Sequence, residues 1–300
     1  MAKIFKTIAC SFAFLSLCGA SAFAQILYGA SGSNGIAGSL YTIDPATGAS
    51  TLVAAITNAN GGGAIGITGL SFNPVNSLLY GITTNAIPSG GNTVRSSLVT
   101  IDITTGVATV IGTLGFANSD ISFRSDGTLF GYEAGNTKGF LSMTTINRNT
   151  GAATRIGDSG LSNTLGGGLA FDSVGELYLS ATGATGTLDI LDPGTGARTA
   201  GPGLSGGPFS PTGGPSGALN AMAFNSLGVL YALDSNRAGV ALVHLVIVDP
   251  LTGMITDLGS VADNMDALAF ASVPEPSSVA LGAIGVLALA GLLWRKRARA

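Results

Sequence analysis

The feature that most constrains the fold is a unit of about 50 residues that occurs five times along the chain. One element of this unit places a large apolar residue, a small residue and phenylalanine in succession. It occurs as Leu70-Ser71-Phe72, Ile121-Ser122-Phe123, Leu169-Ala170-Phe171, Met222-Ala223-Phe224 and Leu268-Ala269-Phe270. Repetition at a period of this length predicts an architecture built from repeated supersecondary units, each of which buries its apolar face against its neighbours.

Two further elements keep the same period. The first is a leucine followed by an aromatic residue, and it occurs as Leu27-Tyr28, Leu79-Tyr80, Leu129-Phe130, Leu177-Tyr178 and Leu230-Tyr231. The second is a strand that ends in Asp or Asn before a Thr-Gly turn, with turns at Asp44–Gly48, Asp102–Gly106, Asn147–Gly151, Asp192–Gly196 and Asp249–Gly253. In such a turn the Asx side chain accepts backbone N–H groups, and the glycine supplies a positive φ.

Each unit therefore contains four short strands, including one after the Thr-Gly turn. Four antiparallel strands per radial unit form the blade of a β-propeller. Glycine makes up 46 of 300 residues and charged residues only 10%, which argues against a helical bundle, a coiled coil and a charged disordered chain. We predict an all-β, five-bladed β-propeller-like domain, with an open β-solenoid or sandwich as the alternative. The glycine-rich insertions at 58–66 and 201–217 are expected to be loops on the rims.

The order of the elements predicts how the ring closes. The first unit begins at Leu27-Tyr28 without a phenylalanine strand, and the last strand, Leu268–Phe270, is a phenylalanine strand with no strands after it. Pairing these two strands completes a fifth blade and removes a free sheet edge.

The N-terminus has the features of a secretory signal peptide. Lys3 and Lys6 precede an apolar stretch, and Ala22 and Ala24 are small residues at the two positions that signal peptidase requires, with Gln25 as the new N-terminus. The alternatives are a buried N-terminal helix and a lipoprotein cleavage site at Cys18. Cleavage after Ala24 removes both cysteines, so the mature chain would contain no disulfide and no cysteine metal site. The expected partners are the Sec translocon and signal peptidase.

The C-terminus has the features of a membrane anchor. Residues 279–294 form an uninterrupted apolar run of 16 residues, about 24 Å long as a helix, against a hydrocarbon core of about 30 Å. A basic stop-transfer cluster follows and is expected to remain in the cytoplasm, which places the main domain on the other side of the inner membrane. This cluster consists of Arg295, Lys296, Arg297 and Arg299.

Pro274-Glu275-Pro276, the apolar helix and the arginine-rich end, in this order, resemble the PEP-CTERM sorting signal of Gram-negative bacteria that produce exopolysaccharide. The resemblance implies that a membrane-embedded exosortase recognises the Pro-Glu-Pro motif and removes the anchor. An ordinary single-pass anchor is the alternative. We expect a signal peptide at 1–24, a propeller-like domain at 25–272 and the sorting signal at 273–300, with a transmembrane helix at about 279–294 and a basic tail at 295–300. The expected location is the cell surface or the extracellular space.

The charge of the central region argues against nucleic-acid binding. Residues 25–272 contain 7 basic and 15 acidic residues, a net charge of −8, which is the wrong sign for phosphate contacts.

Few residues suggest catalytic chemistry. His244, the single histidine, lies in an apolar strand and is expected to be structural. The acidic residues of the Thr-Gly turns are expected to cap those turns, because Asn147 fills the same position without a charge. Weak candidates for a cation site in the channel or on a rim are Asp120, Asp126, Asp172, Glu176, Asp263 and Asp266. We therefore predict no catalytic residues, no metal ligands and no cofactor.

These observations favour a non-catalytic surface or matrix protein whose propeller binds or organises extracellular polysaccharide. The alternative is a propeller-type hydrolase or lactonase that uses carboxylates and a cation in the channel. Ice binding is disfavoured, because the threonines do not form a regular Thr-x-Thr array in every repeat.

Overall fold

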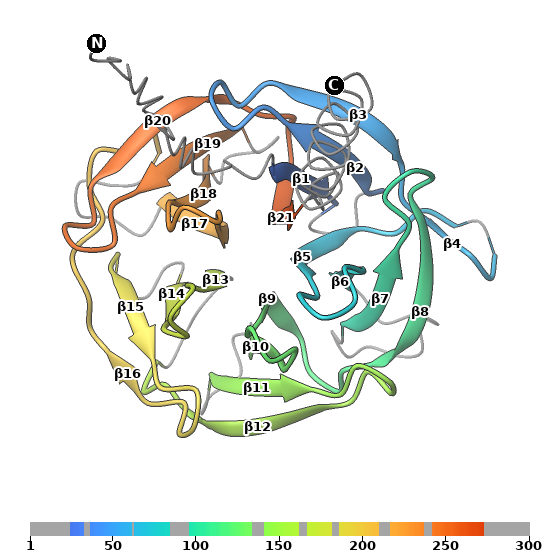
Figure 1. Cartoon of the computed structure of the whole chain (residues 1–300), viewed down its shortest axis with the longest axis horizontal. Coiled ribbons are helices and arrows are strands. Elements are labelled where there is room, and N and C mark those ends of the chain that lie inside the picture. Colours follow the sequence, from blue (N-terminus) through green and yellow to red (C-terminus); the bar gives the residue numbers. More distant parts are fainter. Residues whose placement is uncertain are drawn as a thin grey trace, which may run out of the picture.

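The computed structural model describes residues 25–32, 37–61, 63–84, 96–133, 141–161, 167–181, 186–209, 217–236 and 242–272. Figure 1 shows five antiparallel sheets arranged as blades around a central channel. This is the predicted five-bladed β-propeller. Among the described residues no helix is long and apolar enough to cross a membrane, and the predicted helix at 279–294 lies outside them.

Each blade contains a four-stranded antiparallel sheet. The blade that joins the two ends of the chain is called blade 1, and the others are numbered in the order in which they follow along the sequence. Blade 1 contains β21 (Met265–Ser272), β1 (Gln25–Ser31), β2 (Ser39–Ile43) and β3 (Ser50–Ala55). Blade 2 contains β5 (Ile67–Phe72), β6 (Leu79–Thr83), β7 (Ser97–Ile101) and β8 (Val107–Thr113), with the short β4 (Thr57–Asn58) added at its outer edge. Blade 3 contains β9 (Asn118–Phe123), β10 (Leu129–Glu133), β11 (Ser142–Ile146) and β12 (Ala153–Asp158).

The remaining two blades follow the same order from the channel outward. Blade 4 contains β13 (Gly167–Phe171), β14 (Leu177–Ala181), β15 (Leu188–Leu191) and β16 (Arg198–Thr199). Blade 5 contains β17 (Gly217–Phe224), β18 (Leu230–Asn236), β19 (Val243–Val248) and β20 (Ile255–Ser260).

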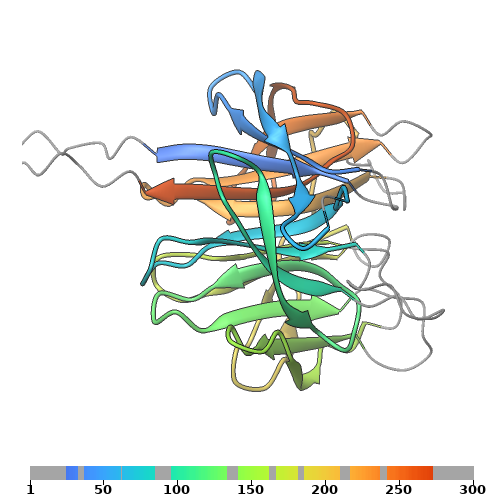
Figure 2. The ribbon, with the colours of Figure 1, turned by 90° about the vertical axis from the view of Figure 1, so that its right-hand side faces the viewer.

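The ring closes through the predicted pairing of its first and last strands. β1 pairs antiparallel with β21, with Leu27 opposite Phe270 and Tyr28 opposite Ala269. This pairing excludes the open solenoid. Gln25 lies opposite Ser272, so both ends of the described domain leave at the same face of the disc (Figure 2).

An aromatic pair joins every blade to the next. The aromatic residue of the second strand of one blade contacts the phenylalanine of the innermost strand of the following blade, with ring centroids 5.1–5.6 Å apart and the rings inclined by 53–70°. The five pairs are Tyr28–Phe72, Tyr80–Phe123, Phe130–Phe171, Tyr178–Phe224 and Tyr231–Phe270. Two of the three repeated sequence elements therefore contact each other across the blade boundaries.

The turn glycines have the predicted conformation. Gly48, Gly106, Gly151, Gly196 and Gly253 all have φ between 72° and 76°. The structure adds a second reason for glycine, which is that the outermost segment of the preceding blade occupies the space of a side chain. A Cβ at Gly151 would lie 2.6 Å from the carbonyl oxygen of Gly112 in β8.

The two glycine-rich insertions are not simple rim loops. The first one begins within β4, which pairs in parallel with β8 of blade 2, and it contains the buried Ile65. Within the second, Ser205 forms a parallel bridge with Met254 at the edge of blade 5. Both segments attach one blade to the outer edge of the next, because an unpaired outer edge presents free N–H and C=O groups.

The surroundings of two turn glycines predict that Gly→Ala lowers the free energy of unfolding by different amounts at the two positions. Gly151→Ala should destabilise the protein by the strain of a positive φ, about 1 kcal/mol, plus about 1–3 kcal/mol for the overlap with Gly112. Gly228→Ala is the matched control, because Gly228 has φ of 78° and a Cβ added there would meet no atom within 4 Å. Denaturant unfolding of the full-length chain in detergent measures both values, and equal losses would contradict the role of the blade contact.

Candidate functional site

The central channel is the site that all five repeats share. The innermost strands direct two side chains each toward it, from the positions one and three residues before the phenylalanine. These positions hold Ser71, Ser122, Ala170, Ala223 and Ala269 in one layer, and Gly69, Asp120, Gly168, Ala221 and Ala267 in the other. Nine of the ten residues are small, because the strands converge at the axis. The exception is Asp120.

The carboxyl group of Asp120 connects the inner strands. Its Oδ1 accepts a hydrogen bond from the N–H of Ile121 at 2.8 Å, and its Oδ2 accepts one from the N–H of Leu169 in blade 4 at 2.9 Å. The N–H of Met222 in blade 5 also donates to this carboxyl group. On the blade 2 side, a Cβ at Gly69 would lie 2.8 Å from Oδ1, so only glycine fits beside the carboxylate. One side chain therefore contacts four of the five blades.

Burial raises the pKa of Asp120 well above its usual range, although the three N–H donors act in the opposite direction. The negative charge of Asp266, on the innermost strand of blade 1, contributes to the increase. Asp120 is 1% exposed, so its carboxyl group is sealed from solvent. This arrangement is better suited to a structural carboxyl group that links neighbouring blades by hydrogen bonds than to a group that reacts with a substrate.

A cavity of about 140 Å³ lies on the phenylalanine side of Asp120. All five innermost strands line it, and no titratable side chain is among its described lining residues. The hydroxyl of Ser71 accepts a hydrogen bond from the N–H of Phe123, and the hydroxyl of Ser122 accepts one from the N–H of Phe171. Alanine replaces serine in the other three blades. The cavity therefore offers hydrogen bonds to water or a hydroxyl group, but no acid or base.

The acidic residues of the Thr-Gly turns cap those turns, as the repeat predicts. In each turn the Asx Oδ1 accepts a hydrogen bond from the backbone N–H two residues later, at 2.7–2.9 Å. The accepting residues are Asp44, Asp102, Asn147, Asp192 and Asp249. These backbone donors lower the pKa of Asp102 and Asp192 below the usual range.

Three other weak cation candidates, Asp126, Asp172 and Glu176, have local partners at the same face as the Thr-Gly turns. Asp126 forms an ion pair with Arg124 at 2.6 Å, and Asp172 accepts N–H groups of its own turn. Glu176 accepts a hydrogen bond from the hydroxyl of Tyr178. Asp263 is exposed, whereas Asp266 is half-buried at the channel. Among the described residues no three His, Cys, Asp or Glu side chains form a group that could hold a metal ion.

His244 lies on β19, the third of the four strands of blade 5. Its Nδ1 is 2.9 Å from Oδ1 of Asp257 on β20, and its ring packs against Phe209 at a right angle. This environment orients the imidazole, and within the described part of the chain Asp257 is the side chain that hydrogen-bonds to it. His244 is therefore placed as a strand histidine, as predicted.

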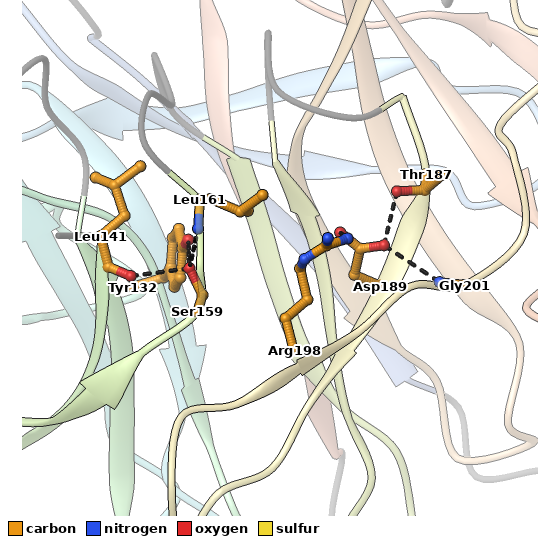
Figure 3. A network of polar contacts seen from close by, with 8 residues as sticks. All are labelled: Tyr132, Leu141, Ser159, Leu161, Thr187, Asp189, Arg198 and Gly201. Atoms are coloured by element: carbon orange, nitrogen blue, oxygen red, sulfur yellow. Dashed lines mark hydrogen bonds and ion pairs between the residues drawn. The ribbon is translucent and has the colours of Figure 1, made fainter. Parts of the chain in front are cut away.

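A buried polar network lies between blades 3 and 4 (Figure 3). Asp189 is fully buried and accepts hydrogen bonds from Thr187 and Gly201, while Arg198 forms an ion pair with it at 3.0 Å. Removing one partner of such a pair costs about 3–5 kcal/mol, against about 0–1 kcal/mol for an exposed pair. Neither residue belongs to a repeated motif, so the sequence pattern carries no signal for this pair.

On the blade 3 side of this boundary, the hydroxyl groups of Tyr132 and Ser159 are 2.7 Å apart. Because Ser159 donates its hydrogen to the carbonyl of Leu141, the Tyr132 hydroxyl is the donor toward Ser159. Burial raises the pKa of Tyr132 to about 12, so the phenol remains neutral. These hydrogen bonds join residues of blade 3 to one another, and the neutral phenol is not an ionised nucleophile.

Residues 272–298 match the family model described as the PEP-CTERM protein-sorting motif. The chain therefore carries this sorting signal immediately after β21, and the signal implies export and processing by an exosortase. The predicted motif residues Pro274, Glu275 and Pro276, the signal-peptide residues Ala22 and Ala24, and the basic tail lie outside the described residues. Gln25 begins β1. No curated protein matches the chain.

Solved structures with a similar fold include the nidogen/laminin complex, at 11% identity, with 83% of this chain and 98% of that chain covered and a TM-score of 0.50. TolB from Acinetobacter baumannii is 14% identical, with 78% and 53% covered and a TM-score of 0.46. A putative 6-phosphogluconolactonase from Bacteroides fragilis is 14% identical, with 82% and 98% covered and a TM-score of 0.41. At these identities the likeness concerns the fold alone.

The raised pKa of Asp120 predicts a stability that falls with increasing pH. Above the pKa of an unfolded aspartate, about 3.9, the unfolded chain releases a proton that the native protein retains. The free energy of unfolding should therefore decrease by up to about 1.4 kcal/mol per pH unit relative to Asp120→Asn. Urea unfolding of both full-length chains between pH 4 and 7 measures this difference.

Asp126→Asn is the matched control with the opposite sign. The Arg124 guanidinium lowers the pKa of Asp126, so its contribution is present above the unfolded pKa and is lost as the pH falls below it. The difference in unfolding free energy between this control and the wild type should therefore be constant at neutral pH and should shrink only toward acid pH. Parallel curves for wild type and Asp120→Asn from pH 4 to 7 would show that Asp120 is ionised in the native protein.

Proposed function

We propose that this protein is exported, sorted by an exosortase through Pro274-Glu275-Pro276, and released as a rigid non-catalytic propeller at the cell surface or in the extracellular matrix. The observation that carries the proposal is the sorting motif at 272–298, which follows the last strand of the closed ring without an intervening domain. The domain order is a signal peptide at 1–24, the propeller at 25–272 and the sorting signal at 273–300.

The chemistry of the described domain supports a binding or structural role. The carboxyl groups that the repeat brings to the turns accept backbone N–H groups, and Asp120 is sealed by the blades that it connects. The channel cavity is lined by backbone groups and serine hydroxyls, which hydrogen-bond polyhydroxylated molecules and water alike. We assign the propeller a binding or organising role toward exopolysaccharide, the material that accompanies this sorting system.

One observation favours the alternative of a propeller-type hydrolase or lactonase. Asp120 and Asp266 interact electrostatically in the channel, and two coupled carboxyl groups are the usual components of acid–base catalysis. If the protein is an enzyme, Asp266→Asn should abolish hydrolysis of lactones or aryl glycosides, while Asp263→Asn, at an exposed position, should not. We expect no turnover by the wild-type protein, together with co-sedimentation with purified exopolysaccharide.

The maturation proposal predicts two new termini. In a host with an exosortase, released protein should begin at Gln25 and lack the segment after the Pro-Glu-Pro motif, as measured by intact mass spectrometry. Pro276→Ala should retain the anchor and leave the protein in the membrane fraction, whereas the neighbouring control Ser278→Ala should be released normally. Released protein that still contains Trp294 would overturn exosortase processing.

A further inference from the structure

The face of the disc at which the domain ends carries exposed apolar side chains. The turns between the first and second strands of the blades lie at this face, because Gln25 of β1 pairs with Ser272 of β21 there. At the apex of three of these turns stand Val75, Val174 and Leu227, which are 67%, 86% and 75% exposed. We call these three residues the apolar tips. The equivalent apex of blade 3 holds Asp126.

Among the described residues, the exposed apolar side chains are concentrated at this face. Leu251, at the apex of a Thr-Gly turn, is 89% exposed, and Ile26, near the start of β1, is 40% exposed. At the opposite face, the described residues include one exposed large apolar side chain, that of Leu242. Exposed apolar side chains gathered on one face of a folded domain mark a contact surface.

The position of the sorting signal identifies what this face meets. The predicted membrane helix begins at Val279, seven residues after Ser272, and seven extended residues span at most about 25 Å. Before processing, the face with the apolar tips is therefore held next to the bilayer, while the opposite face points away from it. We propose that the apolar tips insert into the outer surface of the inner membrane in the anchored precursor, a proposal that rests on the sorting function above.

The charges of this face specify the lipid. The two sets of turns at this face, between the first and second strands and at the Thr-Gly motifs, carry seven acidic and two basic residues. The acidic residues are Asp44, Asp102, Asp126, Asp172, Glu176, Asp192 and Asp249, and the basic residues are Arg124 and Arg148. An excess of carboxylates is repelled by anionic headgroups within about 10 Å at moderate salt. The occupant is therefore a zwitterionic lipid surface.

The test places a fluorescent reporter on the tips of the full chain. Leu227→Cys and Val174→Cys, each with Cys10 and Cys18 replaced by serine, are labelled with an environment-sensitive dye and reconstituted into phosphatidylcholine vesicles. Their emission should shift to the blue, and spin-labelled lipid should quench it. Leu242→Cys on the opposite face is the matched control and should show neither effect. Adding phosphatidylglycerol to the vesicles should reduce the quenching at the tips.

The outcomes separate this inference from the proposed function. Water-like emission at both tips, in chains that alkaline carbonate does not extract, would overturn the membrane contact while the anchored precursor stands. A blue shift without quenching by lipid would assign the face to a second copy of the chain and would also overturn it. Chains that carbonate extracts would refute both the anchor and this inference.

Discussion

The contact between an aromatic ring of one blade and the phenylalanine of the next is the interaction on which the rest of the ring depends. It recurs at all five boundaries with nearly the same centroid separation, including the boundary that joins blade 5 to the closing blade. Each pair contributes about 0.5–1.5 kcal/mol beyond the area it buries. Because each pair packs two neighbouring sheets against each other with nearly the same ring separation, the five contacts repeat one arrangement at every boundary of the ring.

Much of this architecture could be predicted from the sequence, because its causes are local or periodic. Asx and glycine residues define the turns by short-range hydrogen bonds and by φ, so all five turns formed as predicted. The pairing of β1 with β21 followed from the phase of the repeat alone. The aromatic contacts were not predicted, although both partners recur in the sequence, because period and composition do not specify which repeated elements meet across a boundary.

At the candidate site, the repeat pattern does not predict the role of the residues that occur in one blade alone. In the sequence Asp120 is only a weak cation candidate, whereas the alignment of the five inner strands places it among Gly69, Gly168, Ala221 and Ala267. Asp120 is the single carboxyl group in this layer of inward-facing positions, and the four small neighbours leave space for its side chain. The ion pair of Asp189 with Arg198 departs from the repeat in the same way, but it joins residues of one blade without any sequence signature. Positions at which one blade departs from the internal repeat are therefore the positions at which that blade has interactions that the other blades lack.

The strand that completes the ring is also the strand that is tethered. β21 leads directly into the sorting signal, so any tension between the anchored end and the disc acts along β21 and on its pairing with β1. The pull is parallel to the two strands, and their hydrogen bonds are loaded together in shear rather than one after another. Rupture under load is governed by the unfolding rate rather than by equilibrium stability. Because the terminal strand completes blade 1, the pairing of β1 with β21 is the part of the ring that bears the mechanical load in the anchored protein.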